Sequence, residues 1–152
     1  AAGEVCNLVV STSQLGKDYP GFGFLESRAS GTSLGREYTQ KSSVAPDNVD
    51  AEYVFQRARE GDGIALDVIE DFTRHLAMAI VSISSVLDPE AIVLGGGVSN
   101  GADLFLPRLV SLSAPVLQVM PRLEVSKLGD NAGVMGAVAL TLHNINEDPL
   151  KF

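Results

Sequence analysis

The order of helical and strand-like patterns in the second half of the chain constrains the fold more than any other feature. Apolar residues recur at spacings of three and four from Gly63 to Leu87, which predicts one long helix with a single buried face. A short apolar strand follows from Ala91 to Leu94. The remaining patterns predict a helical stretch from Asp103 to Gln118 interrupted by two prolines, a strand from Arg122 to Ser126, and a helix from Asn131 to about His143. This alternation indicates α/β layering with parallel pairing of the late strands.

The first third of the chain has weaker patterns. Val5 to Val10 is typical of a short strand, and glycines and prolines make residues 11–24 an irregular loop. A helix broken by Gly31 and Gly35 is expected from Glu26 to about Gln40.

Polar residues and glycines mark the ends of two predicted helices. Asp47 or Asn48 is the expected N-cap of a helix that Gly61 ends. Asp62 is the expected N-cap of the long helix after it, and Asp88-Pro89 stops that helix because a proline disfavours helical geometry in the residue before it.

Length and charge exclude several classes of function. A chain of 152 residues fits one domain, residues 1–152, since roughly 70% of the unfolded surface can be buried at this length. The formal net charge of −8 repels phosphate backbones, so we expect no nucleic acid bound by this segment. No apolar run approaches the ~20 residues of a membrane span, and the single cysteine, Cys6, cannot form an internal disulfide. These features predict a soluble protein of the reducing cytoplasm, without membrane contact.

The chain opens with AAGEVCNLVV and has no initiator methionine. An apolar stretch so close to the first residue favours a chain cut inside a larger protein. Removal of a methionine before Ala1 would leave the same start.

Three consecutive glycines, Gly95 to Gly97, follow the predicted strand and open a helical stretch. One interpretation is a tight turn that needs positive φ. The other is a close approach of a ligand to bare backbone N–H groups, as happens at the carboxyl ends of strands in α/β folds. Two familiar nucleotide loops fail on spacing, because G-x-G-x-x-G would require glycine at Asn100 and the P-loop would require lysine at Ala102.

Four segments together resemble the ROK family, which comprises repressors, uncharacterised reading frames and sugar kinases. They are GEVCNLVV, GFLESRASGTSLGRE, DPEAIVLGGGVSNG and LEVSKLGDNAGVMGAVAL. They occur in the family's order and cover nearly the whole chain to about His143. The resemblance implies an α/β fold, the carboxyl-terminal lobe of the actin/hexokinase-like (ribonuclease H-like) ATPase fold.

The resemblance also implies a role for several residues. Glu4 and Glu26 match glutamates that bind sugar hydroxyls in the family, and ionised carboxylates suit that task because each accepts several strong hydrogen bonds. Without the family, Glu26 would be interpreted as a residue of a helix N-terminus, and Glu4 as an exposed charge. Gly95, Gly96 and Gly97, followed by Val98 and Ser99, match the family's adenosine motif.

The zinc site of some ROK proteins is not expected in this chain. Asn7 stands where those members have a metal-binding histidine, and the loop STSQLGKDYPGFGF has no cysteine. Cys6 is one position away and is expected to be a buried small apolar residue. Asn7 would keep a hydrogen bond to sugar through its amide. His75 and His143 have no partner at a metal-binding spacing, and we interpret both as structural residues.

The segment LGDNAGVMGA resembles the second connecting helix of the fold. Gly133 and Gly136, three apart, predict close packing of that helix against a neighbour, with Asp130 or Asn131 as N-cap. The family further implies a homodimer, and Val81 and Val86, off the main stripe of the long helix, favour a second packing surface.

By resemblance, the chain is one lobe of a kinase for a hexose or N-acetylhexosamine, with ATP and Mg²⁺ as cofactors of the full-length protein. The DxGGT phosphate loop and the catalytic aspartate motif of such kinases do not occur in the sequence, so the chain alone is expected to be inactive. Two alternatives remain open: the sugar-sensing lobe of a transcriptional repressor, and an unrelated α/β oligomerisation module. The family's repressors commonly carry the zinc loop, so its absence favours the kinase, as do the adenosine glycines.

Overall fold

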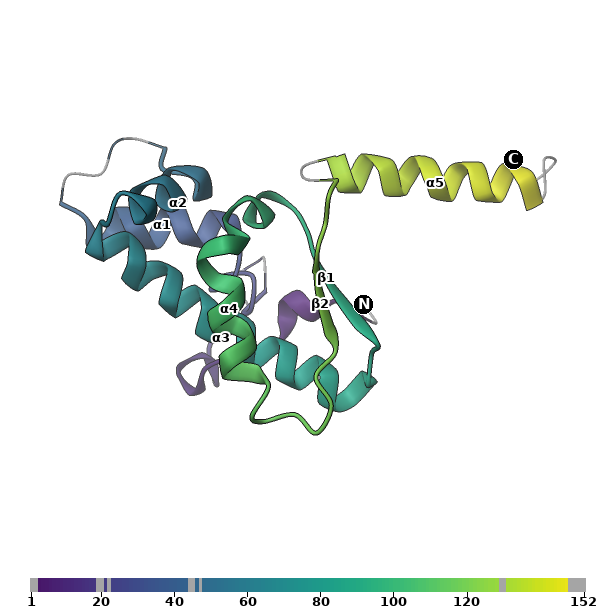
Figure 1. Ribbon diagram of the computed structural model, residues 1–152, viewed down its shortest axis with the longest axis horizontal. Helices are drawn as coiled ribbons and strands as arrows, with labels where there is room; N and C mark the ends of the chain where they lie inside the picture. The colour runs from purple at the N-terminus through teal and green to yellow at the C-terminus, as the bar shows by residue number, and fades with distance from the viewer. Residues whose placement is uncertain are drawn as a thin grey trace.

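The computed structural model describes residues 3–18, 21, 23–43, 46, 48–128 and 131–147, and the side chains up to Leu142 (Figure 1). Within these residues the elements, in chain order, are η1 (Val5–Asn7), η2 (Thr12–Gln14), α1 (Gly31–Lys41), α2 (Ala51–Arg59), α3 (Gly63–Leu87), β1 (Ala91–Leu94), η3 (Gly97–Gly101), α4 (Ala102–Ser113), β2 (Arg122–Val125) and α5 (Ala132–Glu147). The three elements marked η are short 3₁₀ helices.

Helix α3 begins and ends where the sequence predicts. The Asp62 carboxylate caps it by accepting hydrogen bonds from the backbone N–H groups of Ile64 and Ala65, at 2.9 and 3.2 Å. At the other end Asp88 takes the left-handed conformation, with φ of 44°, immediately before Pro89. A strong cap and a strong stop therefore fix the length of the helix.

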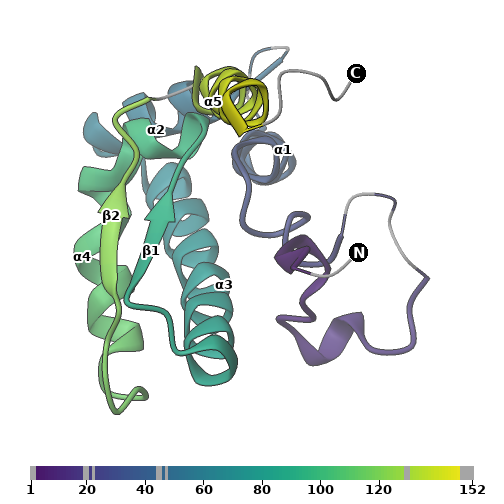
Figure 2. The ribbon, with the colours of Figure 1, turned by 90° about the vertical axis from the view of Figure 1, so that its right-hand side faces the viewer.

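Strands β1 and β2 form a parallel pair in which Ala91 lies opposite Arg122 and Leu94 opposite Val125. Helix α4 connects them, as a parallel pair requires. Figure 2 shows that α3 and α4 both lie on one face of this pair. The expected α/β layering and the parallel pairing are confirmed.

One apolar core joins the sheet to helices α1 to α4. Phe72 of α3 meets Phe105 of α4 edge to face, with ring centroids 5.3 Å apart. Phe55 of α2 and Leu94 of β1 belong to the same cluster. A smaller cluster of Val10, Leu25 and Ala79 attaches the N-terminal segment to α3.

Two predictions for the N-terminal segment are wrong. Val5 to Val10 is not a strand, because the Cys6 carbonyl accepts hydrogen bonds from the amides of Leu25 and Glu26 rather than from a neighbouring strand. Glu26 lies in a turn and not in a helix. Helix α1 begins five residues later, at Gly31, where the side chains and amides of Ser30 and Ser33 form a reciprocal capping box.

Two further boundaries differ from prediction. Helix α2 is capped by Asp50, whose carboxylate accepts from the Tyr53 amide at 2.8 Å, while Asn48 has φ of 60°; Asp47 lies outside the described residues. Pro107 lies inside α4 without ending it. The helix tolerates this proline because Asp103, whose carbonyl loses its helical donor, faces solvent.

Helix α5 projects from the body of the molecule (Figure 1). A Cβ added to Gly133 or Gly136 would meet no atom within 4 Å, so the close packing expected of these glycines is not made with any described part of the chain. Asp130, one of its two expected N-caps, lies outside the described residues. Within the described ranges, no helix is both long and apolar enough to cross a membrane.

Candidate functional site

The three glycines form a turn that joins β1 to η3, whose first residue is Gly97. Gly96 has φ of 76°, a conformation that side-chain-bearing residues adopt only with strain. Its carbonyl accepts hydrogen bonds from the Ser99 amide at 3.0 Å and from the Ser99 hydroxyl at 2.7 Å. The positive φ explains why Gly96 is a glycine, but not Gly95 or Gly97. The Ser99 hydroxyl stabilises the turn itself through its hydrogen bond to the Gly96 carbonyl.

A hollow of about 360 Å³ lies against this turn, and we call it the glycine-turn hollow. Gly95, Gly96, Gly97 and Val98 line it on one side, and Glu26 belongs to its lining as well. Residues predicted separately for the nucleotide and for the sugar therefore share one cavity. The remaining lining residues are Val5, Cys6, Leu25, Ala29, Ser30 and Gly31.

The wall that carries Glu26 is held by backbone hydrogen bonds. The Cys6 carbonyl accepts from the Leu25 amide at 2.9 Å and from the Glu26 amide at 3.4 Å, which ties the turn to η1. Gly23 has φ of 79°, and a Cβ there would overlap the Cys6 carbonyl. Glu26 is exposed, so its carboxylate is open to solvent and to a ligand.

Glu4 and Asn7 lie beside the glycine-turn hollow without lining it. They flank Val5 and Cys6, which do line it, and both are exposed. A Cβ placed on Gly23 would be 3.2 Å from the Asn7 side-chain oxygen, so Asn7 lies close to the turn that carries Glu26. The structure thus brings Glu26 to the glycines and leaves Glu4 and Asn7 at the margin. Cys6, expected to be buried, is half-buried.

Sequence reasoning missed the N-terminus of α1 as part of this site. Ala29, Ser30 and Gly31 lie in the lining between Glu26 and the glycine turn. The serine spacing of the capping box, Ser30 and Ser33, was a readable signal for a helix start at this point.

A second hollow, of about 410 Å³, is lined by residues at the N-termini of α1 and α2 and by residues of η3. Gly31 and Gly97 line both hollows. Asp50 and Glu52 make this α1–α2 hollow acidic, and Asn100 of η3 closes it. No sequence motif predicted it, because its residues come from three elements distant in the chain.

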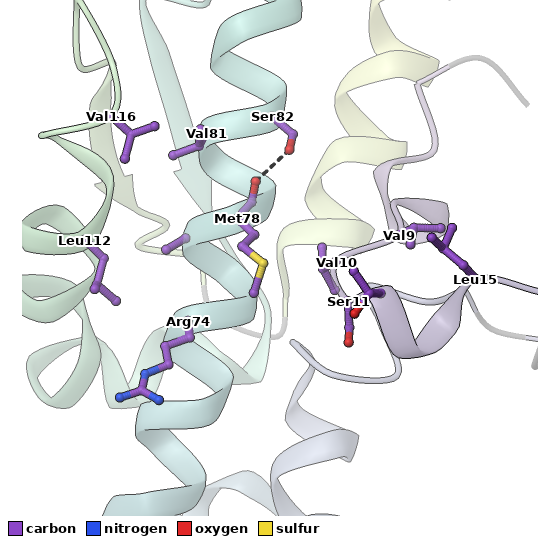
Figure 3. A pocket seen from close by; sticks show the side chains of 12 residues that line it. Val9, Val10, Ser11, Leu15, Arg74, Met78, Val81, Ser82, Leu112 and Val116 are labelled. Atoms are coloured by element: carbon purple, nitrogen blue, oxygen red, sulfur yellow. Dashed lines mark hydrogen bonds between the residues drawn. The ribbon is translucent and has the colours of Figure 1, made fainter.

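A third, largely apolar groove of about 700 Å³ contains none of the predicted site residues. Figure 3 shows Met78, Val81 and Ser82 of α3 between two flanks, with Leu112 and Val116 on one side and the segment around Val10 on the other. We call it the apolar groove. Val81 belongs to it, and Val86, the other valine expected on a second packing surface, is 80% exposed.

The perturbed carboxylates lie outside the hollows and support the fold. The hydroxyl of Tyr38 donates to Asp62 at 2.8 Å, and this bond, with those from the Ala65 amide and Arg57, lowers the pKa of Asp62 to about 2. A hydrogen bond from Arg59 lowers the pKa of Asp103. Among the described residues, no three His, Cys, Asp or Glu side chains are grouped so that they could hold a metal ion.

Solved structures of ROK proteins share this architecture. The structure matches a ROK family glucokinase from Streptomyces griseus, solved in complex with glucose and AMPPNP, with a TM-score of 0.75 and 25% sequence identity. The match covers 92% of this chain and 51% of the glucokinase chain. The predicted actin/hexokinase-like α/β fold is therefore confirmed.

The sequence comparison identifies the family. A sequence model of the ROK family matches residues 19–144, and this chain belongs to the ROK family. An N-acetyl-D-glucosamine kinase of Pasteurella multocida (strain Pm70) is 39% identical over 94 residues, which are 60% of this chain and 31% of the kinase. A proposed xylose repressor of Caldicellulosiruptor sp. (strain Rt8B.4) is 33% identical over 113 residues, 72% of this chain and 28% of the repressor. The chain spans less than half the length of both relatives.

Proposed function

We propose that this chain is the carboxyl-terminal lobe of an ATP-dependent kinase for a hexose or an N-acetylhexosamine. The observation that carries the proposal is the glycine-turn hollow, in which Glu26 shares a cavity with Gly95 to Val98. A sugar held by one wall and a nucleotide held by the other would lie next to each other, as a transfer between them requires.

Glu26 would bind the sugar. Its exposed carboxylate accepts several hydrogen bonds, and bonds from hydroxyls to a charged acceptor are stronger than bonds to a neutral one. Glu4 and Asn7, which flank the hollow, would add contacts to a sugar large enough to reach them.

The glycine turn fits a nucleotide, because Gly95 and Gly96 present backbone without side chains to the hollow. Val98 would contact the nucleoside, while Ser99 orders the turn through its bond to the Gly96 carbonyl. Bound MgATP would supply the phosphoryl group. The work of this chain is to hold and orient both ligands.

The proposed lobe would be inactive alone. Phosphoryl transfer depends on neutralising and positioning the phosphates, and the motifs that do this in sugar kinases of this fold are absent from the sequence. The solved glucokinase, about twice as long as its matched part, supports a second lobe that supplies them.

The sugar-sensing lobe of a repressor is the alternative, and the likeness to a proposed xylose repressor favours it. The two proposals differ in the nucleotide. A repressor lobe would bind sugar and need no nucleotide, whereas the kinase lobe would bind both.

We also propose a homodimer without zinc. The exposed apolar side chains of the apolar groove, Leu15, Met78 and Val116 among them, offer a surface for a second copy of the chain. Light scattering that reports a monomer at every concentration would contradict the dimer. One zinc per chain in metal analysis of protein purified without chelators would contradict the proposed absence of zinc.

Ligand titration of the chain by amide NMR tests the function. We expect millimolar binding of glucose or N-acetylglucosamine and of AMPPNP, with shifts at Glu26 and at Gly96, because one lobe makes only part of the contacts. Glu26→Gln should weaken sugar binding about tenfold, the effect of losing a hydrogen bond to a charge, and leave AMPPNP binding unchanged.

The matched control is Glu90→Gln, at the opposite end of β1 from the glycine turn. It should change neither affinity. Sugar binding that is insensitive to Glu26→Gln would contradict the sugar site. Binding of sugar without any nucleotide would favour the repressor, and binding of neither would leave the unrelated module.

A further inference from the structure

Helix α2 contacts the end of η3, the element that follows the glycine turn, through two residues one helical turn apart, Phe55 and Arg59. The Phe55 ring is fully buried against Gly101, where an added Cβ would overlap the ring. Gly101 thus needs to be glycine because of its neighbour, and its φ of −106° would suit any residue. The Phe55 ring therefore sets the distance between η3 and α2.

Arg59 adds a fork of hydrogen bonds to the same segment. Its Nη2 donates to Asp103 Oδ1 at 2.8 Å and to the Asn100 carbonyl at 3.0 Å, and its Nε donates to Asp103 Oδ2 at 3.3 Å. Asn100 lies in η3, and Asp103 lies in the first turn of α4. One guanidinium therefore joins α2 to the last turn of η3 and to the start of α4.

The segment that Arg59 holds is short and weakly bonded within itself. Element η3 is a five-residue 3₁₀ helix, a form with poor hydrogen-bond geometry. It carries Gly97 and Asn100, which line the α1–α2 hollow opposite Thr32 and Glu52. Any shift of η3 relative to α2 would change the width of this hollow and the direction of the glycine turn.

We propose that Arg59 is a positioning residue for the nucleotide: it holds η3 so that the glycine turn presents its backbone in the binding conformation. This inference rests on the proposed nucleotide site. Arg59 lines neither hollow, so it acts through the Asn100 carbonyl and the Asp103 carboxylate. A turn that is ordered before binding costs less to order on binding, which raises affinity.

Arg108 provides a matched control. It lies on α4, is 49% exposed against 40% for Arg59, and makes a similar fork to Glu70 of α3, at 3.0 to 3.3 Å. It bridges two helices as Arg59 does and has no bond to η3. Removing either fork should have a similar effect on general stability, whereas only Arg59 should affect the turn.

The first experiment needs no ligand. Amide hydrogen exchange is compared for the chain, Arg59→Gln, Arg59→Lys and Arg108→Gln. We expect Arg59→Gln to speed exchange of the Ser99 amide by roughly threefold to tenfold, the effect of losing an exposed charge-assisted fork, with α3 unchanged. Lysine should restore part of the protection. Equal exchange in the Arg59→Gln and Arg108→Gln variants would overturn the proposal.

The second experiment titrates AMPPNP and glucose into the same four proteins. Arg59→Gln should raise the Kd for AMPPNP by roughly threefold to tenfold and leave the Kd for glucose within error, since Glu26 stands on the other wall. Arg108→Gln should change neither. Faster exchange with unchanged AMPPNP affinity would overturn the positioning role while the proposed function stands. Failure of the unaltered chain to bind AMPPNP would overturn the proposed nucleotide site, and the role of Arg59 with it.

Discussion

Helices α3 and α5 are both rich in apolar residues, but α3 is packed into the core and α5 is exposed. Helix α3, 25 residues long, buries one face against α1, α2 and α4 and turns its charged residues outward. Helix α5, 16 residues long, has valine, methionine and leucine around its circumference, and every described side chain from Gly133 to Leu142 is exposed. The difference lies in what the rest of the chain offers to each helix.

The comparison separates the formation of a helix from its stabilisation. A stripe of apolar residues implies a partner on one side only, whereas apolar residues all round are typical of a helix covered on several sides. An isolated helix of this length is marginal in water, because most helical stability in proteins comes from packing. The sequence pattern can therefore predict α5 as a helix without supplying the surface that would hold it.

Hydrogen exchange should show the largest contrast between the two helices. Amides in the middle of α3 should exchange only on global unfolding, and amides in the middle of α5 should exchange through local opening. With a global stability of about 5 kcal/mol or more, the protection factors should differ by about 10³ or more. Equal protection in a monomeric sample would contradict the comparison. If protection of α5 rises with protein concentration, a second copy covers it.

Truncation of one aromatic side chain of α3 should clearly destabilise the body of the molecule. Phe72 is 2% exposed and packs on Phe105, so Phe72→Ala should lower the free energy of unfolding by about 3 to 5 kcal/mol. Leu140 of α5 is 62% exposed, and Leu140→Ala should change it by less than about 0.5 kcal/mol. Urea unfolding followed by circular dichroism measures both. A loss of several kcal/mol for Leu140→Ala would mean that α5 is packed in solution.

The smallest effect concerns the cap of α3 and its pH dependence. The pKa of Asp62 is lowered to about 2 in the folded chain, chiefly by the Tyr38 hydroxyl, against about 3.9 when unfolded. The charged carboxylate therefore stabilises the fold above about pH 4, and this contribution is lost as the pH falls toward 2. Asp62→Asn keeps a capping side chain but removes the charge, so it should lower Tm at pH 6. The difference in Tm between this variant and the unaltered chain should shrink as the pH falls toward 2.

Melting curves recorded from pH 6 to pH 2 test this. A gap in Tm that is constant across the range would show that the ionised carboxylate contributes nothing beyond the cap. Tyr38→Phe removes the main donor and should reproduce part of the effect, while leaving the bonds from the Ile64 and Ala65 amides in place.

The sequence predicted those parts of the fold whose signals are local. Asp62 at one end and Asp88-Pro89 at the other gave α3 its true length, because caps and stops act within a few residues. The strand predicted from Val5 to Val10 is wrong because the donors to the Cys6 carbonyl come from a turn some twenty residues later, which no sequence pattern reveals. The interruption predicted at Pro107 is wrong because a proline stops a helix only where the lost backbone hydrogen bond cannot be replaced by water.

The candidate site likewise contains some residues that the sequence predicted and others that it missed. The three glycines after a strand were visible in the sequence, and Gly96 does need its positive φ. Glu26 was found only through family resemblance, since alone it is one acidic residue among many. Ser30 and Asn100 were missed because their place in the two hollows depends on how α1, α2 and η3 meet.

The parallel pairing of β1 with β2 has a consequence for the order in which the chain acquires its structure. Helices α2 and α3 follow each other in the chain with only a short connection between them, whereas Ala91 can pair with Arg122 only after the intervening α4 has folded back. Contacts between distant residues form slowly, so we expect the strand pair to close late. The glycine turn directly follows β1 and takes its final position with it. A newly made chain should therefore have its helices well before the proposed nucleotide site is complete, and a nucleotide bound at that proposed site should slow the first step of unfolding.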